Sequence, residues 1–252
     1  MSNHYYEILN NIASYHGVFL AQVTPPEKIT YKDSYVYRFS EKSLNQAIVQ
    51  KLARLVTGLR AQLVLHENGL YQEQQSMQRI INDTTEDVEF LSFSMIYSDP
   101  TIHHTQFLAA FYAEKTININ SSEEASKVHR VERQKIRAYL ERISTSQIGG
   151  KSLLDKTKKI YEFHSEFLHA HSAPIMDMYF GTPPHFHLGS MSGTHLQPIY
   201  MSQLWSSFYN GVLAFGYAAE VFKNNIIFDN CLEIAKKLEV YGGKNYSKSE
   251  LN

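Results

Sequence analysis

Apolar residues recur at helical spacing through most of this 252-residue chain, and this periodicity limits the folds that the chain can adopt. Intervals of mostly three or four residues separate the apolar side chains of two long segments, 43–69 and 70–97. The first segment carries Ile48, Leu52, Leu55, Leu59 and Leu63, and the second carries Met77, Ile81, Val88, Leu91 and Met95. Such spacing gives a helix one apolar face, which must pack against other helices. The sequence therefore predicts an all-α protein.

Capping patterns and glycines divide the chain into helices. Three patterns predict helix starts: Ser43 with Gln46 and Ser121 with Glu124, which have capping-box spacing, and Asp99 before Pro100. After a short N-terminal amphipathic helix over residues 1–17, we expect a bundle of about seven helices. They cover residues 43–69, 70–97, 99–115, 121–144, 152–171, 198–222 and 225–240.

These elements predict a single helical domain over residues 1–252 with four parts. Residues 1–42 form the N-terminal helix and an extended arm, in which Tyr35, Tyr37 and Phe39 alternate with other residues as in a strand. Residues 43–171 form the helical bundle, and residues 198–242 form C-terminal helices that close it. Residues 172–197 are an irregular, histidine-rich insertion that could form a hairpin, because prolines and glycines interrupt the helical pattern there.

Composition excludes several classes of protein. The 24 basic and 25 acidic residues leave a net charge of -1, so no overall electrostatic footprint for nucleic acid or anionic lipid exists. Cys231 is the only cysteine, which rules out an intramolecular disulfide and a cysteine-based zinc site. Polar residues interrupt the longest apolar run, 204–222, so we expect a core helix there, no membrane partner and a cytoplasmic location.

Histidines gather in one window and give the first candidate site. Six of the twelve lie there: His164, His169, His171, His185, His187 and His195. Helical spacing places His164 and His171 on or beside the apolar face of the 152–171 helix. Ser165 and His169 are four residues apart on an adjoining face, where a hydroxyl one turn from an imidazole suits a general base. The alternative is a core histidine whose neighbour satisfies its hydrogen bonds.

The insertion gives a second candidate site. If it is extended and turns near Met191, His185, His187 and His195 share one face of a hairpin. Three imidazoles could hold a divalent metal ion, with Asp177 or Glu166 as an oxygen ligand. A di-metal centre in a four-helix bundle needs two E-x-x-H steps, and this chain has one, from Glu166 to His169.

A basic stripe gives a third candidate. Arg130, Arg133 and Arg137 share a face of one helix and could grip phosphates. A solvated helix face explains the same residues. The chain contains no nucleophile elbow, phosphate-binding loop or dinucleotide-binding turn.

Two stretches carry a family resemblance. Arg79-Ile-Ile-Asn-Asp83 lies inside an apolar helix, and Ser165-Glu-Phe-Leu-His169 lies in the segment 161–177. Both resemble a group of uncharacterised bacterial all-helical proteins, some of which are similar to the HEPN superfamily of RNase toxins and antiphage proteins. The resemblance implies that Arg79, Asp83, Ser165 and His169 meet in the bundle interior.

The chain also departs from the catalytic HEPN pattern, in which a histidine follows an arginine by four to six residues. Only Arg60 and His66 have this spacing, and Ala61 stands where a polar residue is usual. On a straight helix, six residues rotate the side chain by about 240°.

Four functions follow as hypotheses. The first is a HEPN-like protein that cleaves or binds RNA in a bacterial defence or toxin system, with Arg79, Asp83, Ser165 and His169 as its catalytic residues. The second is a metal-dependent enzyme that uses His185, His187 and His195. The third is a non-enzymatic interaction protein that binds a second copy or another protein, and the fourth is acid–base chemistry by His169 on a small molecule.

Overall fold

A computed structural model describes residues 2–113, 130–148 and 154–244, and all structural statements concern this part of the chain. Its helices are α1 (Ser2–Leu20), α2 (Leu44–Glu67), α3 (Tyr71–Ile96), α4 (Ile102–Tyr112), α6 (Arg133–Ile143), α7 (Leu154–Leu168), α8 (Ser172–Met176), α9 (Gln197–Val221) and α10 (Asn225–Tyr241). Four short strands are β1 (Glu27–Tyr31), β2 (Ser34–Arg38), β3 (Tyr179–Phe180) and β4 (His185–Phe186). The predicted all-α class is confirmed.

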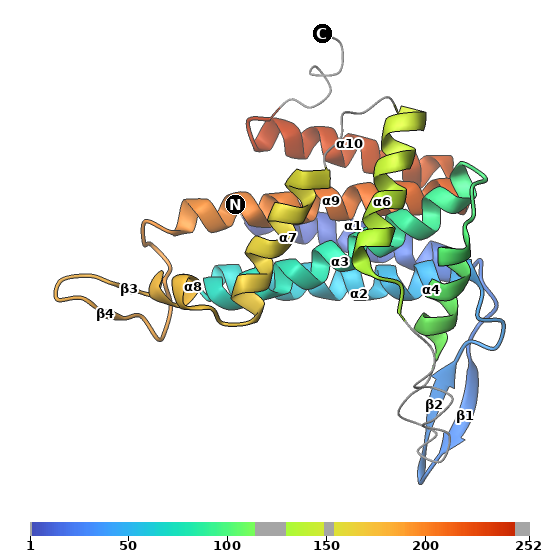
Figure 1. The fold of residues 1–252 in the computed structure, drawn as a ribbon, viewed down its shortest axis with the longest axis horizontal. Coiled ribbons are helices and arrows are strands. Elements are labelled where there is room, and N and C mark those ends of the chain that lie inside the picture. The colour runs from blue at the N-terminus through green and yellow to red at the C-terminus, as the bar shows by residue number, and fades with distance from the viewer. Residues whose placement is uncertain (1, 114–129, 149–153, 245–252) are drawn as a thin grey trace.

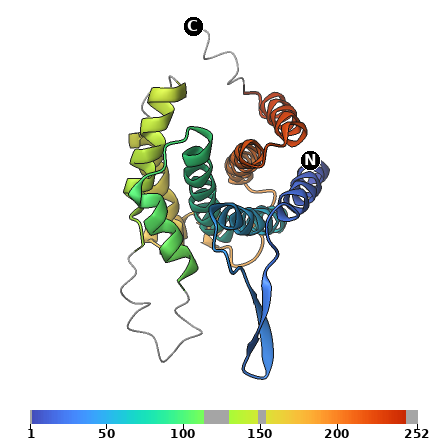
Figure 2. The same cartoon turned by 90° about the vertical axis from the view of Figure 1, so that its right-hand side faces the viewer.

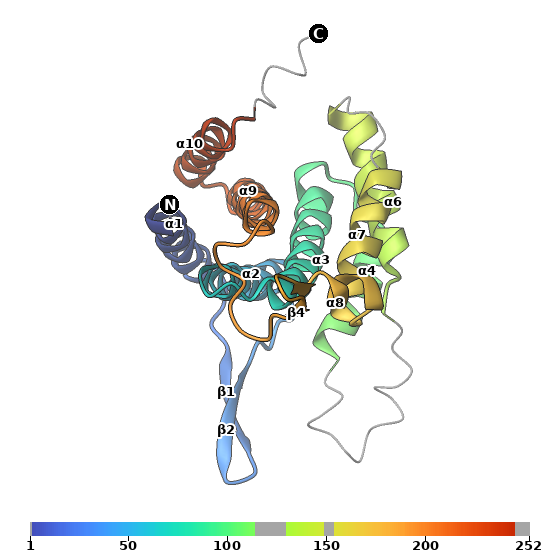
Figure 3. The same ribbon diagram turned by 90° about the vertical axis from the view of Figure 1, so that its left-hand side faces the viewer.

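The helices form three layers, which Figure 3 shows end-on. Helices α2 and α3 pack against each other in the middle, and α9 packs on both of them. The outer helices α1 and α10 lie with α9 on one side, whereas α4, α6 and α7 lie on the other side of α3 (Figure 3). No helix in the described ranges has the length and apolar character needed to cross a membrane.

The two predicted apolar faces build the core. All five residues of the first face, from Ile48 to Leu63 on α2, are buried. On α3, Ile81, Val88 and Leu91 are buried and Met77 is partly buried, but Met95 is 42% exposed. Helix α1, predicted to be amphipathic, buries one face, formed by Tyr5, Ile8, Leu9 and Ile12.

Two of the predicted helix starts can be compared with the structure. The capping box before α2 is present, with the Gln46 N–H donating to Ser43 Oγ at 3.3 Å and the Ser43 N–H donating to Gln46 Oε1 at 3.2 Å. The start predicted at Asp99 is two residues early, because Thr101 is the N-cap and its N–H donates to His104 Nδ1. The predicted pair Ser121 and Glu124 lies outside the described residues.

The extended arm is a two-stranded antiparallel hairpin rather than the single strand predicted. Strands β1 and β2 pair from Glu27 with Arg38 to Tyr31 with Ser34. The hairpin projects away from the helices, as Figure 1 and Figure 2 show from two sides.

The insertion contains a hairpin, but its turn is not where the sequence analysis places it. Strands β3 and β4 pair Tyr179 with Phe186 and Phe180 with His185, so the chain turns over residues 181–184 rather than near Met191. Gly181 adopts a φ of +102° in this turn, where glycine is favoured. Met191 is instead 2% exposed, and its N–H donates to the carbonyl of Gly69 at 3.0 Å.

Gly69 joins this loop to the turn between α2 and α3, and its replacement should destabilise the fold. Its φ is +68°, and a Cβ there would lie 2.7 Å from Met191 N and still closer to two atoms of Ser190 and Ser192. We expect Gly69→Ala to lower the free energy of unfolding by about 2 kcal/mol or more, because strain and overlap add. Urea denaturation measures the change.

Gly17→Ala is the matched control. Gly17 lies inside α1 with open space around its Cα, so alanine should stabilise the protein by about 0.5–1 kcal/mol through helix propensity. Equal effects of the two substitutions would contradict the close approach at Gly69.

Candidate functional site

Helix α7 runs antiparallel to α3, and this brings the part of α7 with Tyr161 and His164 next to Arg79 of α3. Near the middle of α3, Arg79 contacts Tyr161 of α7. Near the start of α3, Tyr71 shares an apolar cluster with Phe167, which is further along α7. One turn after Tyr161, His164 therefore faces the part of α3 just before Arg79. We call Arg79, Asp83, Arg137, Tyr161 and His164 the α3–α7 site.

Two guanidinium groups lie against one aromatic ring in this site. The Cζ atom of Arg79 is 3.5 Å from the centroid of the Tyr161 ring, and that of Arg137, on α6, is 4.1 Å from it. Both arginines are buried, so these cation–π contacts form with little competing water. The Tyr161 ring thereby connects three helices.

Carboxylates on α3 balance most of the positive charge. Arg79 forms an ion pair with Asp83, one turn later on the same helix. Arg137 Nε is 2.9 Å from Glu86 Oε1, and Arg133 Nη1 is 2.6 Å from Asp87 Oδ1. Burial raises the pKa of Glu86, while the hydrogen bond and charge of Arg137 oppose this change.

The same contacts place two residues of the predicted basic stripe. Arg133 and Arg137 are directed toward the acidic residues of α3, and Arg133 Nε is also 3.6 Å from Asp83 Oδ1. Arg130 is exposed and precedes α6. Two of the three arginines therefore have carboxylate partners within the protein.

His164 is a buried histidine beside a cation. Its side chain is 6% exposed, and its Nδ1 has no hydrogen-bond partner among the described residues. Burial, and then the positive charge of Arg79, lower its pKa to about 4. The imidazole is therefore neutral at physiological pH.

Further buried polar atoms of α3 also have no partner within the described ranges. They include Nε of Arg79 and both amide atoms of Gln75, which lies one turn before Arg79 on α3. Buried polar groups are almost always paired, with protein, water or a ligand. These groups can therefore still form hydrogen bonds with water or a ligand.

The predicted catalytic residues are only partly brought together. Arg79 and Asp83 form the expected i,i+4 pair inside the bundle. Ser165 is half-buried next to His164, whereas His169 is exposed just after the end of α7. Only a backbone hydrogen bond, from His169 N–H to Ser165 O at 3.0 Å, joins these two in the described structure.

His164 is thus the histidine of α7 that lies beside Arg79, and it is buried, in agreement with its predicted place on or beside the apolar face. Its position three residues after Tyr161, on the same face, was the available signal. His171 is exposed rather than on or beside the apolar face. The reason is that α7 ends at Leu168 and Ala170 reverses the chain with a φ of +52°.

The three histidines of the insertion gather around an aromatic ring. His187 stacks on Phe180 with 3.8 Å between ring centroids, and His195 meets the edge of the same ring at 5.3 Å. His185 lies 4.4 Å from His187, measured between centroids. Within the described ranges, no three His, Cys, Asp or Glu side chains are grouped to hold a metal ion.

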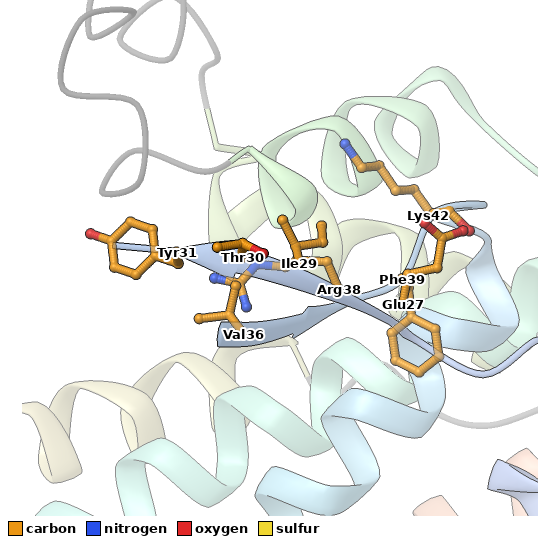
Figure 4. A pocket seen from close by; sticks show the side chains of 9 residues that line it. Glu27, Ile29, Thr30, Tyr31, Val36, Arg38, Phe39 and Lys42 are labelled. Atoms are coloured by element: carbon orange, nitrogen blue, oxygen red, sulfur yellow. The ribbon is translucent and has the colours of Figure 1, made fainter. Parts of the chain in front are cut away.

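A shallow hollow lies elsewhere, along one face of the β1–β2 hairpin (Figure 4). Its lining includes Ile29, Tyr31, Val36 and Phe39, with Arg38 among them. None of the predicted catalytic or metal-binding residues contributes to it.

Comparison of the chain with protein-family models, with curated proteins and with solved structures found no match. Any functional argument therefore depends on the residues of this chain.

The buried histidine predicts an acid-sensitive fold. Since the pKa of His164 is about 4 in the folded protein against an ordinary 6.5, the unfolded state binds the proton first as the pH falls. The stability due to its neutral form is complete above pH 6.5 and is lost on going down to pH 4. The expected loss is on the order of 3 kcal/mol.

Denaturation of wild-type and His164→Gln proteins at several pH values measures this loss. The variant should show a smaller fall in stability between pH 6.5 and 4, whatever its stability at neutral pH. His169→Gln, at an exposed position, should keep the wild-type pH dependence. Parallel curves for wild type and His164→Gln would contradict the assignment.

The contacts of the Tyr161 ring predict that two substitutions at this position differ in their effect on stability. Tyr161→Ala removes the contact with both guanidinium groups and should lower the free energy of unfolding by about 2–3 kcal/mol. Tyr161→Phe keeps the ring and should cost less than about 1 kcal/mol. Similar losses in both variants, measured by urea denaturation, would show that the ring contact is unimportant.

Proposed function

We propose that this protein is a HEPN-like helical protein that binds and cleaves RNA in the cytoplasm, as part of a bacterial defence or toxin system. The α3–α7 site is its phosphate-binding centre. Arg79 binds the phosphate, and His169 carries the proton transfer from the exposed end of α7.

One observation carries this proposal: an arginine of α3 lies beside the histidine-bearing face of α7. Arg79 contacts Tyr161 at 3.5 Å and influences the pKa of His164 through its charge. Arginine forms strong, geometrically specific hydrogen bonds with phosphate, and its Nε here has no partner in the described residues. The resemblance to HEPN proteins favours the same pair of helices.

A phosphate can reach Arg79 from the edge of the site. The Asp83 side chain is 30% exposed and Tyr161 is half-buried, so this edge meets solvent. A phosphate group that enters there exchanges with the Asp83 carboxylate as the partner of Arg79. Asp83 thus competes with RNA for the guanidinium group.

Cleavage without a metal then needs three steps at one phosphate. A base takes the proton of the ribose 2′-hydroxyl, the 2′-oxygen attacks phosphorus, and the P–O5′ bond breaks as an acid protonates the leaving oxygen. Arg79 holds a neighbouring phosphate of the same strand, because Tyr161 beside it lies eight residues, about 12 Å along the helix axis, before His169. We assign the base to His169, with Ser165 one turn earlier on α7, and a solvent water molecule donates the proton to the leaving 5′-oxygen.

Binding tests this proposal through two substitutions of opposite sign. Asp83→Asn removes the competing charge and should strengthen binding of a fluorescent single-stranded RNA, whereas Arg79→Lys should weaken it about tenfold or more, because the planar contacts are lost. Fluorescence anisotropy measures both, and thermal unfolding shows whether each variant is folded.

Cleavage is tested separately on a denaturing gel. His169→Ala should abolish cleavage and leave binding and thermal stability unchanged, because His169 is exposed. The proposal would be refuted if the wild-type protein leaves RNA intact and its binding to RNA does not depend on salt concentration. Intact RNA with salt-sensitive binding would refute its catalytic half.

A further inference from the structure

The β1–β2 hairpin is a second element whose placement points to a ligand. It projects from the helices in all three views (Figures 1, 2 and 3). Residues directly opposite each other in an antiparallel pair lie on the same face. The register therefore places Lys28 with Tyr37, and Thr30 with Tyr35, on one face. We call these four residues the tyrosine face.

The tyrosine face is aromatic, cationic and exposed. The side chains of Tyr35 and Tyr37 are 51% and 55% exposed, and their rings meet edge to face at 5.6 Å. The Lys28 ammonium lies 3.9 Å from the centroid of the Tyr35 ring. No carboxylate pairs with Lys28 among the described residues.

The opposite face has different chemistry. It carries Ile29 and Val36 at its centre and most of the lining of the hollow of Figure 4, to which Thr30 also contributes. Its acidic residue, Glu27, lies opposite Arg38 in the register. The tyrosine face has no acidic residue, so its charge is positive and complements a polyanion.

The rings of Tyr35 and Tyr37 are accessible to a ligand, because both are more than half exposed. An isolated two-stranded hairpin is only marginally stable in water, and neither ring of the tyrosine face is buried by helices in the described structure. Single-stranded nucleic acids bind to surfaces of this composition: bases stack on aromatic rings and amines contact phosphates. Each stacked base contributes about 1–3 kcal/mol.

We propose that the tyrosine face is a stacking platform for single-stranded nucleic acid. Tyr35 and Tyr37 stack bases, and Lys28 leaves the Tyr35 ring to bind a phosphate. The platform lies on the hairpin, outside the α3–α7 site. This proposal rests on the proposed function in one respect only, the preference of the platform for RNA over DNA.

Fluorescence anisotropy with short single-stranded RNA and DNA oligonucleotides, and the full-length protein, tests the platform. The double variant Tyr35→Ala, Tyr37→Ala should bind at least about tenfold more weakly, as expected when one or two stacked bases are lost. Lys28→Gln should reduce the slope of log affinity against log salt by about 0.7, the value for one phosphate of a single strand. Ile29→Thr, on the opposite face, is the matched control and should bind like the wild type.

The outcomes separate this proposal from the α3–α7 site. Binding of DNA and RNA that depends on the tyrosine face, but not on Arg79 or Asp83, supports the platform and refutes the phosphate-binding centre. Binding that the tyrosine double variant leaves unchanged overturns the platform, and so does a wild-type protein that binds neither oligonucleotide. If the wild-type protein binds neither oligonucleotide, a protein partner for this face becomes the alternative.

Discussion

The contact of Arg79 and Arg137 with the Tyr161 ring attaches α7 to α3 and α6. Of the α7 side chains described, from residue 159 to 168, only His164 and Phe167 are buried, so apolar packing alone holds this helix weakly. The remaining attachment of α7 is polar and consists of two cation–π contacts. Helix α6, which carries Arg137, is held to α3 by ion pairs and also buries Ile136 and Ile143 in the core. Breaking a buried ion pair by removing one partner costs about 3–5 kcal/mol, which explains how polar contacts can fix two helices.

A second polar network fixes α2, α3 and α9 against one another. Gln78 Oε1 of α3 accepts hydrogen bonds from Gln62 of α2 and from Ser207 of α9. One turn earlier, Gln74 contacts His66 and donates to the carbonyl of Tyr200. All of these contacts lie within a mostly apolar core. Because an unpaired amide in the core is costly, these bonds favour one register of the three helices over others with similar apolar contacts.

Much of the fold was predictable because local signals decide it. The apolar spacing of α2 and the capping box at Ser43 depend on neighbours within one helix, and both match the structure. The hairpin in the insertion was misplaced because Gly181, Pro183 and Pro184, a local turn signal, form the turn instead of the segment near Met191. In the sequence, Met191 resembles a turn position. In the structure, its N–H donates to the carbonyl of Gly69 and the residue is buried.

The candidate site was less predictable for a related reason. The sequence indicated Arg79 and Asp83, whose pairing is local to α3. It could not show that α7 lies antiparallel to α3, and this arrangement puts His164 rather than His169 beside Arg79. The two guanidinium groups at Tyr161 come from α3 and α6, so no spacing within one helix reveals them.

The polar attachment of α7 also has a consequence for motion. When α7 separates from α3, it exposes two guanidinium groups and, among its described side chains, only two buried ones, His164 and Phe167. Separation of α6 exposes aliphatic core as well, because Ile136 and Ile143 are buried there. We therefore expect local opening of α7 alone to have a smaller heat-capacity change, and a weaker dependence on denaturant, than unfolding of α2, α3 and α9.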